Sequence, residues 1–266
     1  MKHNPIIELA AVSYTFPGEK KPILENVNFA IGSEQMGLIG PNGCGKTTLL
    51  DLICRHRIPQ RGTIVYAGRS LDNYSRRSLA RQIALVPQDY GIRFPFTVAE
   101  VVLMGRYPHT PRFGAPSPTD MQRVRQVMVD CDVLKFKDRS ITTLSGGERQ
   151  RVVFARALAQ DTPVMVLDEA TANLDVCHAL TLLDRVADLV NAQNRTVIAV
   201  FQDLNLAAAY SQEMVMLEAG RVVAAGSTAE VLTPANLRTV FNIDARVAMD
   251  DFTGRLQVRY KRRVMH

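Results

Sequence analysis

Residues 40–48 constrain this chain more than any other stretch, because they read GPNGCGKTT and match the pattern G-x-x-x-x-G-K-[ST]. The apolar run MGLI at residues 36–39 precedes them, and LLDLI at residues 49–53 follows as the first turns of a helix. A strand, a glycine-rich loop and a helix in this order indicate a phosphate-binding loop, or P-loop. The alternative is a glycine-rich turn that matches by chance, and the later motifs argue against it.

The residue types of this loop suit a nucleotide phosphate. Gly43 and Gly45 permit backbone conformations that direct successive N–H groups at one anion. The helix that begins near Lys46 brings its positive end to the same place. Lys46 can reach the β- and γ-phosphates, and the Thr47 hydroxyl can hold Mg²⁺. The residues predicted to bind the nucleotide here are Gly40, Pro41, Asn42, Gly43, Cys44, Gly45, Lys46, Thr47 and Thr48.

Length and composition point to a cytosolic α/β protein. The chain has 266 residues, of which 47% are hydrophobic and 22% charged, enough for one large domain or two small ones. No apolar run approaches the ~18 residues of a membrane span, and the beginning, MKHNPIIELAAV, lacks the apolar core of a signal peptide. Four widely separated cysteines without a C-x-x-C pair favour single buried thiols over a metal or disulfide site.

The net charge of +6 does not predict a nucleic-acid partner, because most basic residues are scattered along the chain. The exception is the run RYKRR at residues 259–263. It suits either a contact with acidic lipid headgroups or a solvated tail.

The first strands carry a candidate for stacking on a nucleotide base. Residues 6–31 alternate apolar and polar side chains around turn residues at 17–22, which predicts an antiparallel hairpin. Phe16 lies at its tip and can stack on the adenine face. Tyr14 is the rival for that role, and a core aromatic is the structural alternative.

The middle of the chain predicts a second lobe. The apolar run at residues 82–87 is typical of a strand, and Gln88 at its end can coordinate Mg²⁺ or hold the attacking water. Thr97 and Glu100 form a capping box that opens a helix through Met104. A second helix has an apolar stripe, and we expect residues 97–140 to form a helical insertion. The stripe comprises Met121, Val124, Val127, Met128 and Cys131.

A second anion site follows at residues 144–151, which read LSGGERQR. Ser145 and Glu148 make another capping box. Gly146 and Gly147 leave bare N–H groups at the positive end of the helix, beside the Ser145 hydroxyl. A chain with one P-loop needs a second phosphate site only if two copies face each other, each offering this helix end to the other's γ-phosphate.

Two carboxylates end the next buried strand. Residues 164–169 read VMVLDE, and acids at such a position are costly unless they serve a metal or a reaction. Asp168 suits the coordination shell of Mg²⁺, and Glu169 suits the role of a general base that polarises water. Asp175 follows in a turn before the next helix and is also predicted to contribute to nucleotide binding.

In this order, the P-loop, the lone glutamine, LSGGE, the Asp-Glu strand and a turn ending in Asp resemble the nucleotide-binding subunit of ATP-binding cassette (ABC) transporters. The resemblance covers nearly the whole chain. It implies a P-loop NTPase fold of ABC type with an antiparallel β subdomain, a helical subdomain at about 97–160 and a C-terminal extension at about 228–266. It also implies adenine stacking by Phe16, a Q-loop role for Gln88, catalysis by Glu169, and a head-to-tail dimer enclosing two ATP. The implied signature motif is Ser145, Gly146, Gly147 and Glu148.

Two positions depart from the family pattern. The family usually has histidine after the strand at residues 196–201, where this chain has Gln202. An amide can hydrogen-bond a γ-phosphate or water but cannot become an imidazolium, so the hypothesis is slower hydrolysis with ATP binding retained. Ala170 replaces the usual proline, with little expected effect.

Local runs resemble the importers of iron-siderophore, haem and cobalamin. They are FPFTV at 94–98, MGRYPH at 104–109 and DLNLAA at 203–208. A molybdate or tungstate importer, a soluble ABC ATPase and an exporter remain alternatives. The resemblance implies two permease subunits, an extracytoplasmic substrate-binding protein and a peripheral location on the cytoplasmic membrane face. The expected permease contact is the groove between lobes, including Phe94, Phe96, Arg106 and Tyr107.

The end of the chain predicts structure without evident chemistry. Residues 214–226 read as a hairpin, followed by two short helices around Pro234. Residues 245–260 can form a further hairpin around Thr253 and Gly254.

Overall fold

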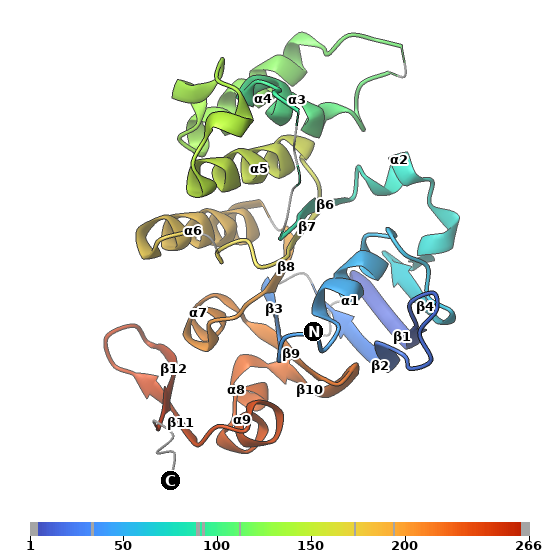
Figure 1. The fold of residues 1–266 in the computed structure, drawn as a ribbon, viewed down its shortest axis with the longest axis vertical. Coiled ribbons are helices and arrows are strands. Elements are labelled where there is room, and N and C mark those ends of the chain that lie inside the picture. The colour runs from blue at the N-terminus through green and yellow to red at the C-terminus, as the bar shows by residue number, and fades with distance from the viewer. Residues whose placement is uncertain are drawn as a thin grey trace.

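A central six-stranded sheet organises the computed structural model, which describes residues 5–32, 35–88, 91, 94–111, 113–172, 174–193 and 195–261 (Figure 1). The strand order is β10-β9-β3-β8-β7-β6, in which β9, β3, β8, β7 and β6 are parallel and β10 is antiparallel to β9. The strands are β3 (Gln35–Ile39), β6 (Ile83–Val86), β7 (Val164–Leu167), β8 (Thr196–Val200), β9 (Glu213–Glu218) and β10 (Arg221–Ser227). The predicted hairpin at residues 214–226 is therefore β9–β10.

A four-stranded antiparallel sheet, in the order β2-β1-β4-β5, lies beside the central sheet. Its strands are β1 (Ile7–Tyr14), β2 (Leu24–Ile31), β4 (Arg61–Tyr66) and β5 (Arg69–Ser70). Helix α1 (Lys46–Ile53) packs between the two sheets, because its Leu49 and Leu52 share one apolar core with Val27 of β2 and Val200 of β8. The predicted N-terminal hairpin is confirmed by the pairing of β1 with β2. The antiparallel β subdomain thus holds the helix that follows the P-loop.

Helices α3, α4 and α5 gather into a lobe at one end of the molecule (Figure 1). The α-helices described after α1 are α2 (Arg76–Leu79), α3 (Val98–Leu103), α4 (Pro118–Asp130), α5 (Gly146–Gln160), α6 (Val176–Gln193), α7 (Leu204–Tyr210), α8 (Thr228–Val231) and α9 (Pro234–Phe241). The two predicted capping boxes are confirmed at Thr97 and Ser145. Met121 does not belong to the apolar stripe of α4, because it lies at the first turn and is 51% exposed.

The C-terminal hairpin pairs β11 (Ala245–Asp250) with β12 (Arg255–Tyr260) and contacts α7. Of the predicted buried thiols, Cys44 and Cys131 are buried and Cys54 is half-buried, whereas Cys177 is exposed on α6. The last part of the basic run, residues 262–263, lies outside the described residues. Among the helices described, none is long and apolar enough to cross a membrane.

A nearly buried ion pair fixes the start of the helical lobe. Arg106 Nε donates to Asp120 Oδ1 at 2.7 Å, and the two side chains are only 12% and 10% exposed. The guanidinium also donates to the carbonyl oxygen of Ala159 at 2.7 Å, which ties α5 to the chain before α4. Hydrogen bonds from Ser117 and then from Arg106 lower the pKa of Asp120 from 3.8 to about 2.

We expect Asp120→Asn to lower the free energy of unfolding by about 3 kcal/mol at pH 7, because it leaves the Arg106 charge nearly buried without its partner. Since the folded-state pKa of Asp120 is depressed, its contribution is present above about pH 4 and is lost as the pH falls toward 2. Urea unfolding at pH 7 and pH 3 therefore measures a larger difference between variant and wild type at pH 7. Asp132→Asn is the matched control, because Asp132 pairs with Lys135 at the exposed surface and should cost less than ~1 kcal/mol. Equal losses from both variants would contradict this role for the buried pair.

Candidate functional site

The P-loop and the polar residues predicted at the ends of three neighbouring strands meet at one edge of the central sheet. The P-loop follows β3, Gln202 follows β8, Asp168 and Glu169 follow β7, and Gln88 follows β6. These four strands are adjacent and parallel, so their carboxyl ends lie side by side. Such an edge is where open α/β sheets bind their ligands.

The conformation of the P-loop depends on glycine at two positions. Gly45 begins α1 with a φ of +106°, and a Cβ there would lie 2.7 Å from Leu24 Cδ2. Gly40 has a φ of +154°, and its Cβ would lie 2.3 Å from the carbonyl oxygen of Leu217. Lys46 is 6% exposed, and its Nζ donates to the carbonyl oxygens of Gly40 at 2.8 Å and Pro41 at 3.0 Å. The ammonium group is therefore held within the curl of the loop.

Thr47 and Asp168 form an oxygen-rich pair at the base of the site. The Thr47 hydroxyl donates to Asp168 Oδ1 at 3.3 Å across the gap between α1 and β7. Asp168 is 4% exposed, and burial raises the pKa of its carboxyl despite the opposing Thr47 hydrogen bond. A cation beside this carboxylate would oppose that rise in pKa, because a positive charge favours the charged form.

Glu169 is the carboxylate that faces the cavity, and two amides hold it. Gln202 Nε2 donates to Glu169 Oε2 at 2.5 Å, and Gln88 Nε2 donates to the same oxygen at 2.6 Å. The backbone of Glu169 has a φ of +50°, a strained conformation that is characteristic of functional sites. Because both amides use Oε2, Oε1 is the oxygen left to accept a proton.

A cavity of about 340 Å³ lies over these groups. Its lining includes Phe16 from the strand tip as well as P-loop residues, Gln88, Glu169 and Gln202. Tyr14, the rival for adenine stacking, is 6% exposed in the core, and its hydroxyl accepts a hydrogen bond from Arg57 at 3.1 Å. The Arg57 guanidinium also lies 4.7 Å from the Phe16 ring centroid. Of the two aromatics, Phe16 is the one at the cavity.

The structure does not bring the second predicted anion site into this cavity. Ser145 caps α5, and Glu148 Oε2 accepts hydrogen bonds at 2.8 Å from both the Ser145 amide and hydroxyl. These bonds lower the pKa of Glu148. Ser145 and Gly146 are exposed at the helix end, apart from the residues that line the P-loop cavity.

Asp175 also lies outside the cavity lining. Its Oδ1 accepts from the amide of His178 at 2.9 Å and lies 2.8 Å from the His178 ring Nδ1. These contacts lower the pKa of Asp175. The neighbouring position 173 lies outside the described residues.

One buried contact of the site was not anticipated from the sequence. Gln150 is 1% exposed, and its Nε2 donates to the carbonyl oxygen of Ala170 at 2.9 Å. The bond ties α5 to the segment that carries Glu169. A glutamine on the apolar side of a helical pattern is the signal that points to such a contact.

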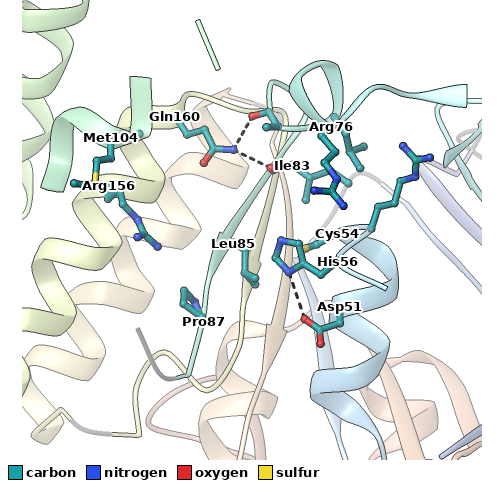
Figure 2. A pocket seen from close by; sticks show the side chains of 14 residues that line it. Asp51, Cys54, His56, Arg76, Ile83, Leu85, Pro87, Met104, Arg156 and Gln160 are labelled. Carbon is teal, nitrogen blue, oxygen red and sulfur yellow. Dashed lines mark hydrogen bonds and ion pairs between the residues drawn. The ribbon is translucent and has the colours of Figure 1, made fainter. Parts of the chain in front are cut away.

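A second cavity, of about 680 Å³, lies between residues of the helical lobe and residues of α1, α2 and β6. Figure 2 shows Arg76 of α2 and Arg156 of α5 on opposite sides of Leu85. Neither guanidinium has a hydrogen bond or a carboxylate partner among the described residues, and burial lowers the pKa of Arg156. The apolar floor includes Leu79, Ile83 and Pro87.

The expected permease contact is corrected at Arg106. Its side chain is engaged with Asp120 and Ala159 inside the lobe, so it belongs to the fold of the lobe. Phe94 and Tyr107 are 71% and 62% exposed, and Phe96 is 39% exposed.

The P-loop between β3 and α1, with acids and amides at the ends of the neighbouring strands, defines a P-loop nucleotide-binding protein. The family model described as ABC transporter matches residues 24–172, and the chain belongs to this family.

Two curated relatives illustrate the group. The chain is 45% identical over 237 residues to the cobalamin import ATP-binding protein BtuD of Halobacterium salinarum, a match that covers 89% of this chain and 59% of that protein. It is 37% identical over 234 residues to the iron(3+)-hydroxamate import ATP-binding protein FhuC of Bacillus subtilis, covering 88% and 87%. The chain thus spans little more than half of the first relative and most of the second.

Solved structures give the same assignment. A transporter assigned to the metal-chelate type of ABC transporter, in an inward-facing conformation, aligns with a TM-score of 0.82 and 28% identity over 97% of both chains. A dimeric ATP-binding cassette in a post-hydrolysis state with ADP and Pi aligns with a TM-score of 0.73 and 26% identity, covering 84% of this chain and 98% of that one. The expected ABC fold is confirmed.

Proposed function

We propose that this chain is the ATP-binding subunit of an importer for an iron chelate, haem, cobalamin or a similar compound, and that it hydrolyses Mg·ATP to drive uptake. The proposal depends chiefly on the position of Glu169, whose carboxylate two amides hold beside the P-loop. The relatives that import cobalamin and iron(3+)-hydroxamate support the cargo class.

In the proposed reaction, Glu169 accepts a proton from the attacking water. Its Oε2 is fixed by Gln88 and Gln202, so Oε1 can be presented to water without freedom to rotate. Holding a base in one orientation lowers the barrier by reducing the entropy that the reaction must lose. The Lys46 ammonium neutralises charge on the β- and γ-phosphates, and the ring of Phe16 stacks on adenine.

The oxygen donors at the base of the site fit Mg²⁺, which prefers a few protein oxygens together with phosphate oxygens and water. Thr47 and Asp168 would hold it, with the Gln88 amide oxygen as a further ligand. When bound, Mg²⁺ reduces the negative charge of the phosphates. The same positive charge would counteract the effect of burial on the pKa of Asp168.

A second copy would complete the site. Ser145 and Gly146 are exposed at a helix end apart from the P-loop cavity, with Gly147 half-buried beside them, and a helix end is suited to a γ-phosphate. In a head-to-tail dimer, each copy offers this end to the nucleotide of the other. Asp175, which is exposed, is proposed to take part in the dimer contact as well.

Two permease subunits are the proposed membrane partners, with the chain on the cytoplasmic face and a substrate-binding protein on the other side. The cavity between the lobe and the sheet is the proposed permease contact (Figure 2). Part of its lining is apolar, and of the three arginines that line it, Arg76 and Arg156 have no hydrogen-bond or carboxylate partner among the described residues, so they suit an inserted segment that carries a carboxylate. The exposed side chains of Phe94 and Tyr107 are proposed to take part in the permease contact as well.

Two experiments test the proposal. In the first, a non-hydrolysable ATP analogue is added to the purified chain, and in the second, the chain is isolated from detergent-solubilised membranes. We expect light scattering to show a doubling of the 29.5 kDa mass, and we expect an integral membrane protein to co-purify. A chain without ATPase activity, or one that never associates with a membrane protein, would contradict the proposal.

Gln202→His is expected to raise the ATPase rate about fivefold, since an imidazolium forms a charge-assisted hydrogen bond to the γ-phosphate that is stronger by ~1 kcal/mol than that of an amide. Steady-state ATPase assays from pH 6 to pH 9 measure the change, and the gain should fall as the histidine loses its proton. No gain at any pH would remove the hypothesis that Gln202 slows hydrolysis.

A further inference from the structure

The C-terminal hairpin is hydrogen-bonded to the helix that follows Gln202. Asn205, in the first turn of α7, has its Oδ1 2.7 Å from the Val258 amide nitrogen, from which it accepts a hydrogen bond. Asn205 Nδ2 donates to the Val258 carbonyl oxygen at 3.4 Å. A single side chain thus pairs with both backbone groups of one residue of β12. Only an amide offers a donor and an acceptor in this arrangement.

The contact is part of a packed interface. Val258 is 3% exposed and belongs to the main apolar core, and Val247 and Leu256 of the hairpin pack against the same core. Leu204 and Leu206 of α7 pack there as well. The hairpin is therefore held by apolar burial, and the hydrogen bonds of Asn205 fix its position relative to α7.

Gln202 lies on a short connection with both ends anchored. On one side, Phe201 is 4% exposed, and its amide donates to the Leu38 carbonyl oxygen of β3 at 3.2 Å. On the other side, Asp203 caps α7, because its Oδ1 accepts from the amides of Asn205 at 2.7 Å and Leu206 at 3.1 Å. With the sheet fixed, the position of the first turn of α7 determines where the Gln202 side chain points.

We propose that Asn205 is a positioning residue, which uses the C-terminal hairpin as a brace to hold Gln202 against Glu169. The proposal rests on the proposed ATPase function. Asn205 does not line the P-loop cavity and acts only through Gln202, whose Nε2 lies 2.5 Å from Glu169 Oε2. The extension at about 228–266, which carried no chemistry in the sequence, thereby gains a role in catalysis.

The expected kinetic effect follows from this geometry. Loss of the brace allows the first turn of α7 to shift, and a shift of about 1 Å at a catalytic group has large effects on rate. The P-loop and Phe16 are on other elements, so binding of ATP is not affected. Asn205→Leu should lower kcat about tenfold and leave the KM for ATP within about twofold.

The test is a double-mutant cycle on the full-length chain, with steady-state ATPase assays of Asn205→Leu, Gln202→Ala and the double variant. If Asn205 acts through Gln202, Asn205→Leu lowers kcat in the wild-type chain and has no further effect in the Gln202→Ala chain. Asn205→Asp keeps an acceptor for the Val258 amide and should retain most of the rate. Asn205→Ser, too short to reach Val258, should repeat the loss if the leucine variant does not fold.

Asn236→Leu is the matched control, because Asn236 Nδ2 donates to the Val231 carbonyl oxygen at 2.8 Å within the C-terminal helices and, among the described residues, has no hydrogen bond to α7. It should reduce stability without changing kcat. The proposal is overturned if Asn205→Leu leaves kcat unchanged, if it causes the same loss with and without Gln202, or if Gln202→Ala has no effect. A wild-type chain without ATPase activity would instead refute the proposed function.

Discussion

Glu169→Gln is expected to reduce ATP turnover by about two to three orders of magnitude, because it removes the one carboxylate among the described residues that line the cavity, and this carboxylate is placed to accept the proton of water. ATP binding should persist, since Lys46, Thr47 and the P-loop amides are unchanged. The amide of the variant also keeps the side chain in place, because its oxygen can accept from Gln88 Nε2 or Gln202 Nε2. Single-turnover hydrolysis and equilibrium binding of ATP, measured on the same preparation, separate these effects.

The control for this variant is Glu25→Gln, which removes an exposed carboxylate that pairs with Arg221 at 2.8 Å. Its turnover should stay within about twofold of wild type, because exposed ion pairs contribute little. Light scattering adds a second readout, since blocked hydrolysis should let the ATP-bound dimer accumulate. Turnover retained by Glu169→Gln would show that another group is the base, and Asp168 would be the next to examine.

The local motifs were predictable from sequence because each depends on neighbours in the chain. The P-loop needs glycines at fixed spacing before a helix, and the capping boxes at Thr97 and Ser145 need only a hydroxyl and an acid three residues apart. The convergence of Gln88, Glu169 and Gln202 was implied once each was placed at the end of a strand. Parallel strands then bring such residues to one edge.

What the sequence did not reveal depends on contacts between distant segments. Arg106 looked like a surface residue in a basic loop, and only the fold shows that it is neutralised by Asp120. Asn205 belongs to a recognisable run, DLNLAA, but its partner Val258 is 53 residues away. Gln150 likewise pairs with the Ala170 backbone across 20 residues. Every residue type offers a backbone carbonyl group, and all except proline offer a backbone N–H group. A hydrogen bond to the backbone therefore does not require a particular partner residue, and a single sequence does not predict it.

Lys46→Met is expected to weaken ATP binding about a hundredfold, because the methionine keeps the apolar stem of the side chain but removes the charge that faces the phosphates. This corresponds to ~3 kcal/mol, within the range for loss of one partner from a buried charge pair. Calorimetric titration of the variant with ATP measures the affinity directly. The fold should be retained, since only the hydrogen bonds to Gly40 and Pro41 are lost.

Two further variants identify the origin of that loss. Lys20→Met removes an exposed charge from the turn after Phe16 and should leave ATP affinity unchanged within about twofold, since solvent screens charges at the surface. Thr47→Val should weaken binding of ATP only when Mg²⁺ is present, because its hydroxyl is proposed to hold the ion rather than the phosphate. A Lys46→Met chain that binds ATP as tightly as wild type would mean that backbone amides and the α1 terminus alone hold the phosphates. In that case the role assigned to the Lys46 ammonium would be wrong. The role of Glu169 would be unaffected, because the Glu169→Gln variant tests it separately.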